Sequence, residues 1–195
     1  MEIKKLLKTL CEASGVSGDE FSASEKAAEL LREYTDEVSV DSFGNARAFI
    51  GSRENGKKTV LLDAHLDEIG LIVTFIDDKA FIKVSNRAGI DRRLLLAQTV
   101  TVHGKEKIKG VVSTLPPHVS KDSSKAPKLE DIAIDTGYSK QELEKIVSLG
   151  DRITIDSEFS ELLGSKVTSK AIDDRSGVAA VIYAVELLYI DENSN

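Results

Sequence analysis

The sequence predicts an α/β fold with a β-rich middle portion, and two observations point to it. The segment from Lys58 to Ala64 is apolar at its centre without polar alternation, as expected for a strand buried on both faces in the middle of an α/β sheet. From Leu71 onward the character changes to short strands separated by tight turns, which predicts a small β-barrel or sandwich.

Two helices and a pair of strands are expected before the apolar segment. Apolar residues at helical spacing predict a helix over residues 2–13. A second helix is expected from Ser22 to Tyr34, with Ser22 and Glu25 forming a capping box at its start. Short strands on either side of the turn-forming pair Gly44-Asn45 are expected over residues 37–40 and 46–50.

Hairpins and a polar loop are expected in the middle of the chain. The hairpin turns fall near Asp78 and Gly104, between strands over residues 71–76, 80–84, 99–102 and 108–112. The polar stretch 114–129 contains all three prolines, Pro116, Pro117 and Pro127, and we expect it to be a mobile loop.

The last third returns to helices and strands. A helix from Lys140 to Leu149 is expected to be capped by Ser139 and Glu142 and to end at Gly150. The final helix, residues 174–189, is apolar around nearly its whole circumference, so we expect protein on most of its sides. Strands are expected over residues 131–135, 152–155 and 166–170.

Composition narrows the class of protein. The net charge of -7 and the pI of about 5.1 argue against a nucleic-acid partner, which needs a basic face, and give no attraction to an anionic membrane. No segment approaches the roughly 20 apolar residues of a membrane span, and no signal peptide is visible. The one cysteine, Cys11, cannot form an intrachain disulfide. We therefore expect a cytoplasmic protein.

The first candidate site is the run from Asp63 to Gly70, at the carboxyl end of the predicted central strand, where ligand sites of open α/β sheets lie. His65 could bind a metal through one ring nitrogen while Asp67 holds the other and fixes the tautomer. Residues two apart in an extended segment point the same way. The alternative is an acidic surface turn, and spacing alone does not separate the two interpretations.

The second candidate site is the pair Asp173 and Asp174, where a predicted strand passes into the final helix. A carboxylate in that place can bridge two divalent cations held about 4 Å apart. The alternative is an N-cap that satisfies the first amides of the helix. Together the two motifs supply one imidazole and one carboxylate, a mixed set that suits zinc, cobalt or manganese.

The remaining candidates are weaker. His103 and His118 are lone histidines that we expect on the surface, one in a hairpin turn and one in the proline-containing stretch. Cys11 is expected to be buried and inert in its helix. No phosphate-binding, dinucleotide-binding or nucleophile-elbow motif occurs in the sequence.

Five motifs in a fixed order carry a resemblance to a known family: Leu10 to Gly18 with Glu20, Asp41-x-Phe43-Gly44-Asn45, Asp63-Ala64-His65-x-Asp67-Glu68-Ile69-Gly70, Leu129-Glu130-Asp131-x-x-Ile134-Asp135-x-Gly137 and Ala171-x-Asp173-Asp174-Arg175-x-Gly177. Over nearly its whole length the chain resembles the metallo-aminopeptidases that include glutamyl aminopeptidases, deblocking aminopeptidases and the TET particles. Some members of that family carry an older label of endoglucanase.

The resemblance implies a zinc-peptidase-like α/β/α sandwich interrupted by a small β-rich barrel domain. Residues 1–70 and 164–195 would form the catalytic domain, and residues 71–163 the inserted domain of a dimerisation type. Two divalent metal ions, zinc or cobalt, are implied. His65 would bind one ion, Asp173 would bridge both, and Asp67 would support His65. The peptide bond after Asp173 is expected to be cis.

The implied activity is the release of the amino-terminal residue from a peptide substrate by water activated between the two ions, in a homo-oligomer assembled through the inserted domain. The family's general base, a further aspartate and a late histidine would lie beyond residue 195. The chain then resembles an N-terminal fragment and is expected to show little activity by itself. Glu68 is a conceivable substitute for the base, although its place at a strand end gives no support.

Two alternatives remain open. One is a non-catalytic remnant or assembly partner. The other is an endoglucanase, which normally needs two carboxyl groups at a defined separation and no metal. The aromatic content of 5% without tryptophan is poor for stacking against sugars.

Overall fold

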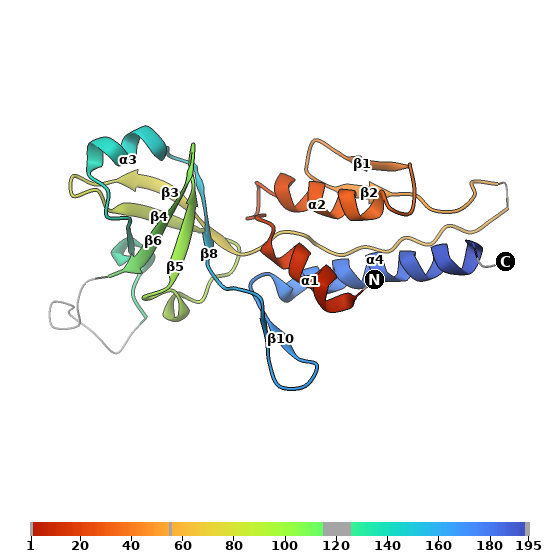
Figure 1. Cartoon of the computed structure of the whole chain (residues 1–195). Coiled ribbons are helices and arrows are strands. Elements are labelled where there is room, and N and C mark those ends of the chain that lie inside the picture. The colour runs from red at the N-terminus through yellow and green to blue at the C-terminus, as the bar shows by residue number, and fades with distance from the viewer. Residues whose placement is uncertain (1, 55, 115–125, 194–195) are drawn as a thin grey trace. The chain divides into compact units, whose positions relative to one another are not determined.

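The structure, a computed structural model, describes residues 2–54, 56–114 and 126–193. The chain divides into two compact units (Figure 1). Unit 1 comprises Met1–Glu68 and Glu158–Asn195, and unit 2 comprises Ile69–Ser157. The catalytic and assembly roles expected for the two parts of the chain stay predictions.

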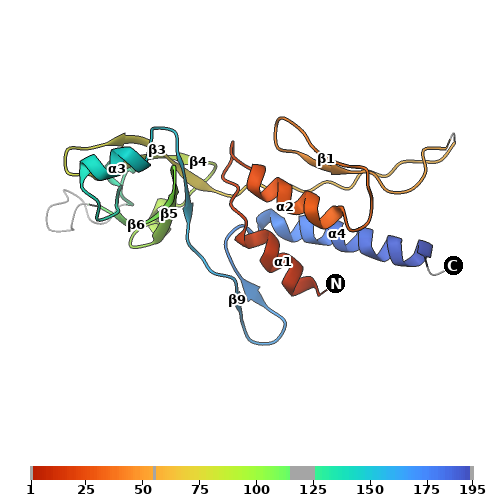
Figure 2. The same ribbon diagram turned by 45° about the horizontal axis from the view of Figure 1, so that its top comes forward.

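Unit 1 packs three helices together with a small hairpin (Figure 2). Its elements are α1 (Ile3–Glu12), α2 (Phe21–Leu31), β1 (Val38–Val40), β2 (Ala46–Ala48), β9 (Ser160–Glu161), β10 (Val167–Thr168) and α4 (Ile172–Asn193). β1 and β2 pair antiparallel, which confirms the predicted strands around Gly44-Asn45. The core consists of apolar side chains from the three helices: Leu6, Leu10, Ala27, Leu31, Val178, Ala179, Ile182 and Val185.

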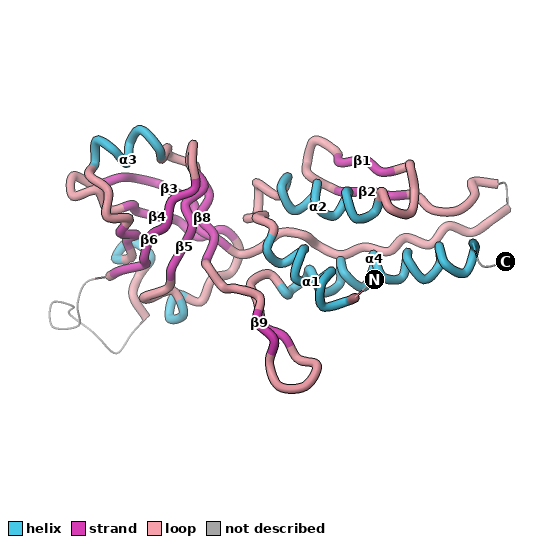
Figure 3. The backbone as a smooth tube through the Cα atoms, in the orientation of Figure 1, coloured by secondary structure: helices cyan, strands magenta, loops and turns pink. Residues whose placement is uncertain are grey.

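Unit 2 is a closed six-stranded antiparallel barrel (Figure 3). Its strands are β3 (Gly70–Ile76), β4 (Ile82–Arg87), β5 (Thr99–His103), β6 (Lys107–Ser113), β7 (Ala133–Asp135) and β8 (Arg152–Ile155). They follow one another around the barrel in the order β3-β4-β7-β6-β5-β8. The short segments η1 (Arg92–Leu94), η2 (Leu129–Asp131) and α3 (Lys140–Ile146) lie between them in sequence. The predicted barrel and both predicted hairpins are confirmed.

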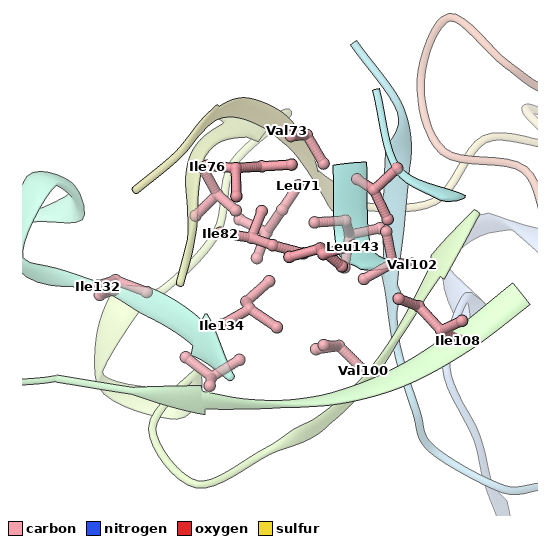
Figure 4. Packing of buried hydrophobic residues seen from close by; sticks show 14 of the residues in the cluster. Leu71, Val73, Ile76, Ile82, Val100, Val102, Ile108, Ile132, Ile134 and Leu143 are labelled. Atoms are coloured by element: carbon pink, nitrogen blue, oxygen red, sulfur yellow. The ribbon is translucent and has the colours of Figure 1, made fainter. Parts of the chain in front are cut away.

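Alternate residues of the barrel strands point inward and form its apolar core. β6 alternates exposed and buried side chains along most of its length, as expected for a strand with one solvated face. Leu71, Ile82 and Ile134 are fully buried and pack together inside the barrel (Figure 4). The predicted capping box also forms at the start of α3, where the side chains of Ser139 and Glu142 each accept from the other's backbone amide.

The expected central strand over Lys58–Ala64 is wrong for this chain. The segment is extended without strand pairing, and Val60 and Leu61 are 79% and 87% exposed. A strand needs neighbours for its backbone hydrogen bonds, and none of the described strands pairs with this segment. The expectation that the last helix is covered on most of its sides is also wrong. One face of α4 packs in the core, whereas Leu187, Leu188 and Ile190 are exposed.

Two expected helix boundaries are also wrong. α2 begins at Phe21, so Ser22 lies inside the first turn and cannot cap it; Glu20 stands at the N-cap position without a side-chain capping bond. α3 ends at Ile146, and Gly150 adopts a φ of 95° in the turn beyond it.

Two predictions depend on residues outside the described ranges. His118 lies outside them, as does most of the stretch expected to be a mobile loop. Within the described ranges, no helix is both long enough and apolar enough to span a bilayer.

Candidate metal centre

The structure brings His65, Asp67 and Asp173 together at one place in unit 1. His65 and Asp67 lie on the extended segment that precedes β3, and Asp173 lies at the start of α4. His65 Nδ1 is 2.9 Å from Asp67 Oδ1, and His65 Nε2 is 3.3 Å from Asp173 Oδ1. The imidazole therefore lies between two carboxylates that are far apart in sequence.

This geometry fits a metal ion of the zinc type. Two ligands bound to one tetrahedral ion at about 2.0–2.1 Å lie about 3.3–3.4 Å apart, and His65 Nε2 and Asp173 Oδ1 are separated by 3.3 Å. If the hydrogen on Nδ1 points to Asp67, the lone pair of Nε2 faces Asp173, which is the tautomer that a metal requires. The side chain of Asp173 is 98% exposed, so an ion can reach it from solvent.

The electrostatics of His65 reflect its two acidic neighbours. Desolvation works to lower the pKa of His65, but the hydrogen bonds and negative charges of Asp67 and Asp173 outweigh it, so the pKa is raised. A positive charge is thus favoured between these carboxylates, whether carried by the imidazolium or by a metal ion.

The two aspartates of the second motif have different surroundings. Asp174 Oδ1 accepts a hydrogen bond from the amide of Gly177 at 3.1 Å, the interaction that an N-cap residue makes. Asp173 instead faces His65. The peptide bond between Asp173 and Asp174 is cis, as the resemblance implied. The capping interpretation therefore applies to Asp174, and the predicted metal-bridging role of Asp173 stays a prediction.

Behind the site lies a group of contacts that the sequence did not reveal. The hydroxyl of Ser17 donates a hydrogen bond to Asp67 Oδ2. Glu68 is buried and forms an ion pair with Lys170. Arg175 is fully buried, and its Nε donates to the carbonyl of Leu66 at 3.0 Å. The sequence hints at these contacts only in that Lys170 directly precedes the second motif and Arg175 is part of it.

The other candidate residues make contacts that stabilise the fold and do not point to a functional site. Since the carboxylate of Glu68 is engaged by Lys170 inside the protein, it does not suit the role of a general base. His103, expected on the surface, is partly buried in β5, with Nε2 2.9 Å from Thr154 Oγ1. Cys11 is buried as expected, and this burial raises the pKa of its thiol. Among the described residues no three histidine, cysteine, aspartate or glutamate side chains are placed to bind one metal ion together, because Asp67 faces the ring nitrogen of His65 opposite to the one that faces Asp173.

Comparison with known proteins identifies the family. Residues 44–194 match the profile of the M42 glutamyl aminopeptidases. The chain is 31% identical to the lysyl aminopeptidase of Pyrococcus furiosus over 94% of its own length and 54% of that protein. The chain therefore belongs to the M42 aminopeptidase family. It spans about half the length of the curated relatives that it matches.

Solved structures agree with this assignment. An aminopeptidase from the archaeon Desulfurococcus kamchatkensis superposes with a TM-score of 0.88 and 35% identity, covering 95% of this chain and 52% of that one. The TET1 peptidase of Pyrococcus horikoshii, which can assemble into a tetrahedron or a large octahedral shell, superposes with a TM-score of 0.83 and 33% identity, covering 94% of this chain and 56% of that one. A Thermotoga maritima protein named as an endoglucanase superposes with a TM-score of 0.77 and 32% identity, covering 92% of this chain and 53% of that one. This confirms that the older label of endoglucanase occurs within the family.

Proposed function

We propose that this chain contributes part of the metal centre of an aminopeptidase that removes amino-terminal residues from peptides. The observation that carries the proposal is the 3.3 Å separation of His65 Nε2 from Asp173 Oδ1, with Asp67 2.9 Å from the other ring nitrogen. This arrangement has the spacing and the supporting carboxylate expected of a metal-bound histidine.

Each residue has a defined task in this proposal. His65 and Asp173 would hold a divalent ion, zinc or cobalt, and Asp173 would also help to hold a second ion. Asp67 orients the imidazole and makes it more basic, and Ser17 in turn orients Asp67 through its hydroxyl. When bound, such ions lower the pKa of water and polarise a carbonyl group.

The proposed reaction needs more groups than these. A catalytic zinc ion usually has three protein ligands, and general acid–base catalysis contributes about 10²–10⁴ in rate. We propose that the further metal ligands and the general base come from other residues of the whole enzyme. The 195 residues of this chain should therefore bind metal weakly and turn over little substrate by themselves. We also propose that the site lies in a zinc-peptidase-like α/β/α sandwich in the whole enzyme.

Calorimetric titration with Co²⁺ and Zn²⁺ tests the metal site. Binding to the wild-type chain should be weakened at least tenfold by His65→Ala and by Asp173→Asn. Asp36→Asn removes the same charge from an exposed aspartate before β1 and should leave binding unchanged. Equal affinity of the wild type and the His65→Ala variant would refute the proposed site.

Turnover separates the remaining alternatives. With metal added, hydrolysis of aminoacyl p-nitroanilides should be slow, abolished by a chelator and absent in Asp173→Asn. Rapid turnover would contradict the need for further groups. Chelator-resistant release of sugar from a β-glucan would support the endoglucanase alternative. Metal binding with no turnover at any concentration would favour the non-catalytic alternative.

Assembly is proposed to involve the barrel of unit 2. The support is the TET1 peptidase, which assembles into large shells and resembles this chain in structure. Light scattering after size exclusion should give a mass well above the 21.2 kDa of one chain, whereas a mass equal to one chain at all concentrations would contradict the proposal.

A further inference from the structure

Three charged side chains form an ion cluster in unit 1: Glu68 and Arg175, which are buried, and Lys170, which is partly buried. Lys170 Nζ is 2.7 Å from both carboxylate oxygens of Glu68, and Arg175 Nη2 is 3.6 Å from Glu68 Oε1. The exposed fraction of the side chain is 3% for Glu68 and 0% for Arg175. The two cations exceed the one anion, and main-chain carbonyl oxygens accept further hydrogen bonds from Lys170 Nζ and from Nε and Nη1 of Arg175.

Most of those carbonyl oxygens lie at and just beyond the end of α1. Arg175 Nη1 donates to Leu10 O at 2.6 Å and also to Ala13 O, and Lys170 Nζ donates to Ala13 O at 3.2 Å. The carboxyl end of a helix carries partial negative charge and unpaired carbonyls, so both cations are stabilised there. Desolvation lowers the pKa of Lys170, and the charge of Glu68 opposes this shift.

Stability alone does not account for such a cluster. Removing charges from water costs several kcal/mol per ion, and apolar replacements of buried ion pairs are often equally stable or more stable. What charged groups add is directional hydrogen bonding, which fixes the relative positions of the segments that carry them.

The segments fixed here are the two that carry the proposed metal ligands. Glu68 directly follows Asp67, and its main chain pairs with Gly15 and Ser17, while its side chain accepts from the amide of Gly15 at 3.0 Å. Lys170 precedes Asp173 by three residues. Arg175 follows Asp173 by two residues and binds the carbonyl of Leu66, the residue between His65 and Asp67.

We propose that the Glu68–Lys170–Arg175 cluster is a positioning device that holds the His65 segment and the Asp173 segment at metal-binding separation. This inference rests on the metal site proposed above and adds to it the residues that set its geometry. These residues act through His65 and Asp173 and do not themselves bind the ion.

The test is the affinity of the whole chain for Co²⁺, measured by titration together with the visible absorption spectrum of the bound ion. Lys170→Met leaves the oppositely charged pair Glu68 and Arg175 and should raise the Kd for Co²⁺ about tenfold or more, with an altered spectrum. Lys170→Arg keeps the charge and should bind within about threefold of the wild type. Glu68→Gln should weaken binding at least as much as Lys170→Met.

Stability and structure separate positioning from a general loss of folding. Thermal unfolding is measured on each variant, and a crystal structure of the Lys170→Met variant reports the separation of His65 Nε2 and Asp173 Oδ1, which should depart from 3.3 Å. A Kd within twofold of the wild type in both Lys170→Met and Glu68→Gln, or an unchanged separation, would overturn the positioning role.

A further variant distinguishes this failure from failure of the proposed function. If His65→Ala abolishes Co²⁺ binding and Lys170→Met does not affect it, only the positioning role is lost. If His65→Ala binds Co²⁺ as the wild type does, the metal site is wrong and the positioning role is overturned with it.

Discussion

Replacing Gly15 with alanine tests how closely the loop after α1 packs against the ion cluster. A Cβ at this position would lie 2.8 Å from Arg175 Nη2 and 2.9 Å from Ala23 Cβ, whereas non-bonded atoms reach their optimum at about 3.5–4.0 Å. Ala23 belongs to α2, and the guanidinium of Arg175 is held by main-chain carbonyls. Both neighbours are buried, so a shift of either one disturbs the packing around it.

The expected loss of stability follows from these contacts. Overpacking of a filled core costs about 1–3 kcal/mol. A shift of the loop would also weaken the two hydrogen bonds between Gly15 and Glu68, 3.0 and 2.8 Å long, each contributing about 0.5–1.5 kcal/mol. The lower entropy of alanine in the unfolded chain offsets about 0.4–1 kcal/mol. We expect the free energy of unfolding to fall by about 2–3 kcal/mol.

The assay is urea unfolding followed by circular dichroism at 222 nm, because α1, α2 and α4 all lie in unit 1. The midpoint should fall at unchanged slope. Gly89→Ala is the control, since a Cβ there meets no atom within 4 Å and should change stability by less than about 0.5 kcal/mol. A Gly15→Ala variant as stable as the control would refute the packing argument.

Three further predictions concern other parts of the chain. Ser139→Ala removes the capping box of α3 and should lower the free energy of unfolding by about 1 kcal/mol in a thermal melt; an unchanged melting temperature would contradict it. Asp156 is partly desolvated, which raises its pKa, but hydrogen bonds from Lys109 and Thr101 outweigh this and lower the pKa. Its stabilising contribution is therefore present above the unfolded pKa and lost as pH falls through the folded pKa. Asp156→Asn should lower the urea midpoint at neutral pH and lose this effect once the pH is below the folded pKa of Asp156. Leu61 is 87% exposed, so Leu61→Lys should reduce aggregation in light scattering and change stability by less than about 0.5 kcal/mol; a larger loss would show that this side chain is packed.

Features that depend on neighbouring residues were predictable from the sequence. The turns near Asp78 and Gly104 divide the barrel strands correctly because turn chemistry is local. The capping box at Ser139 is likewise contained in four successive residues. The same pattern failed at Ser22, because α2 begins at Phe21 and no local rule shows which of several polar residues becomes the N-cap.

Features that depend on distant residues were predicted less well. The apolar run at Val60 has the composition of a buried strand, but burial requires partner strands, and within the described residues none pairs with it. Lys170 and Glu68 are 102 residues apart in sequence, so no local pattern reveals their ion pair. The pairing of His65 with Asp67 follows from their spacing of two residues in an extended segment, whereas only the family motifs pointed to Asp173 as a further member of the site. The roles of these three residues at a metal ion stay predictions.

Anomalous diffraction from crystals of the chain grown with Zn²⁺, with data collected on both sides of the zinc absorption edge, tests the proposed metal centre most directly. We expect an anomalous peak within about 2.0–2.2 Å of both His65 Nε2 and Asp173 Oδ1, with Asp67 still bound to His65 Nδ1. A peak at other residues, or none at this pair when the crystals are saturated with zinc, would contradict the proposed metal centre.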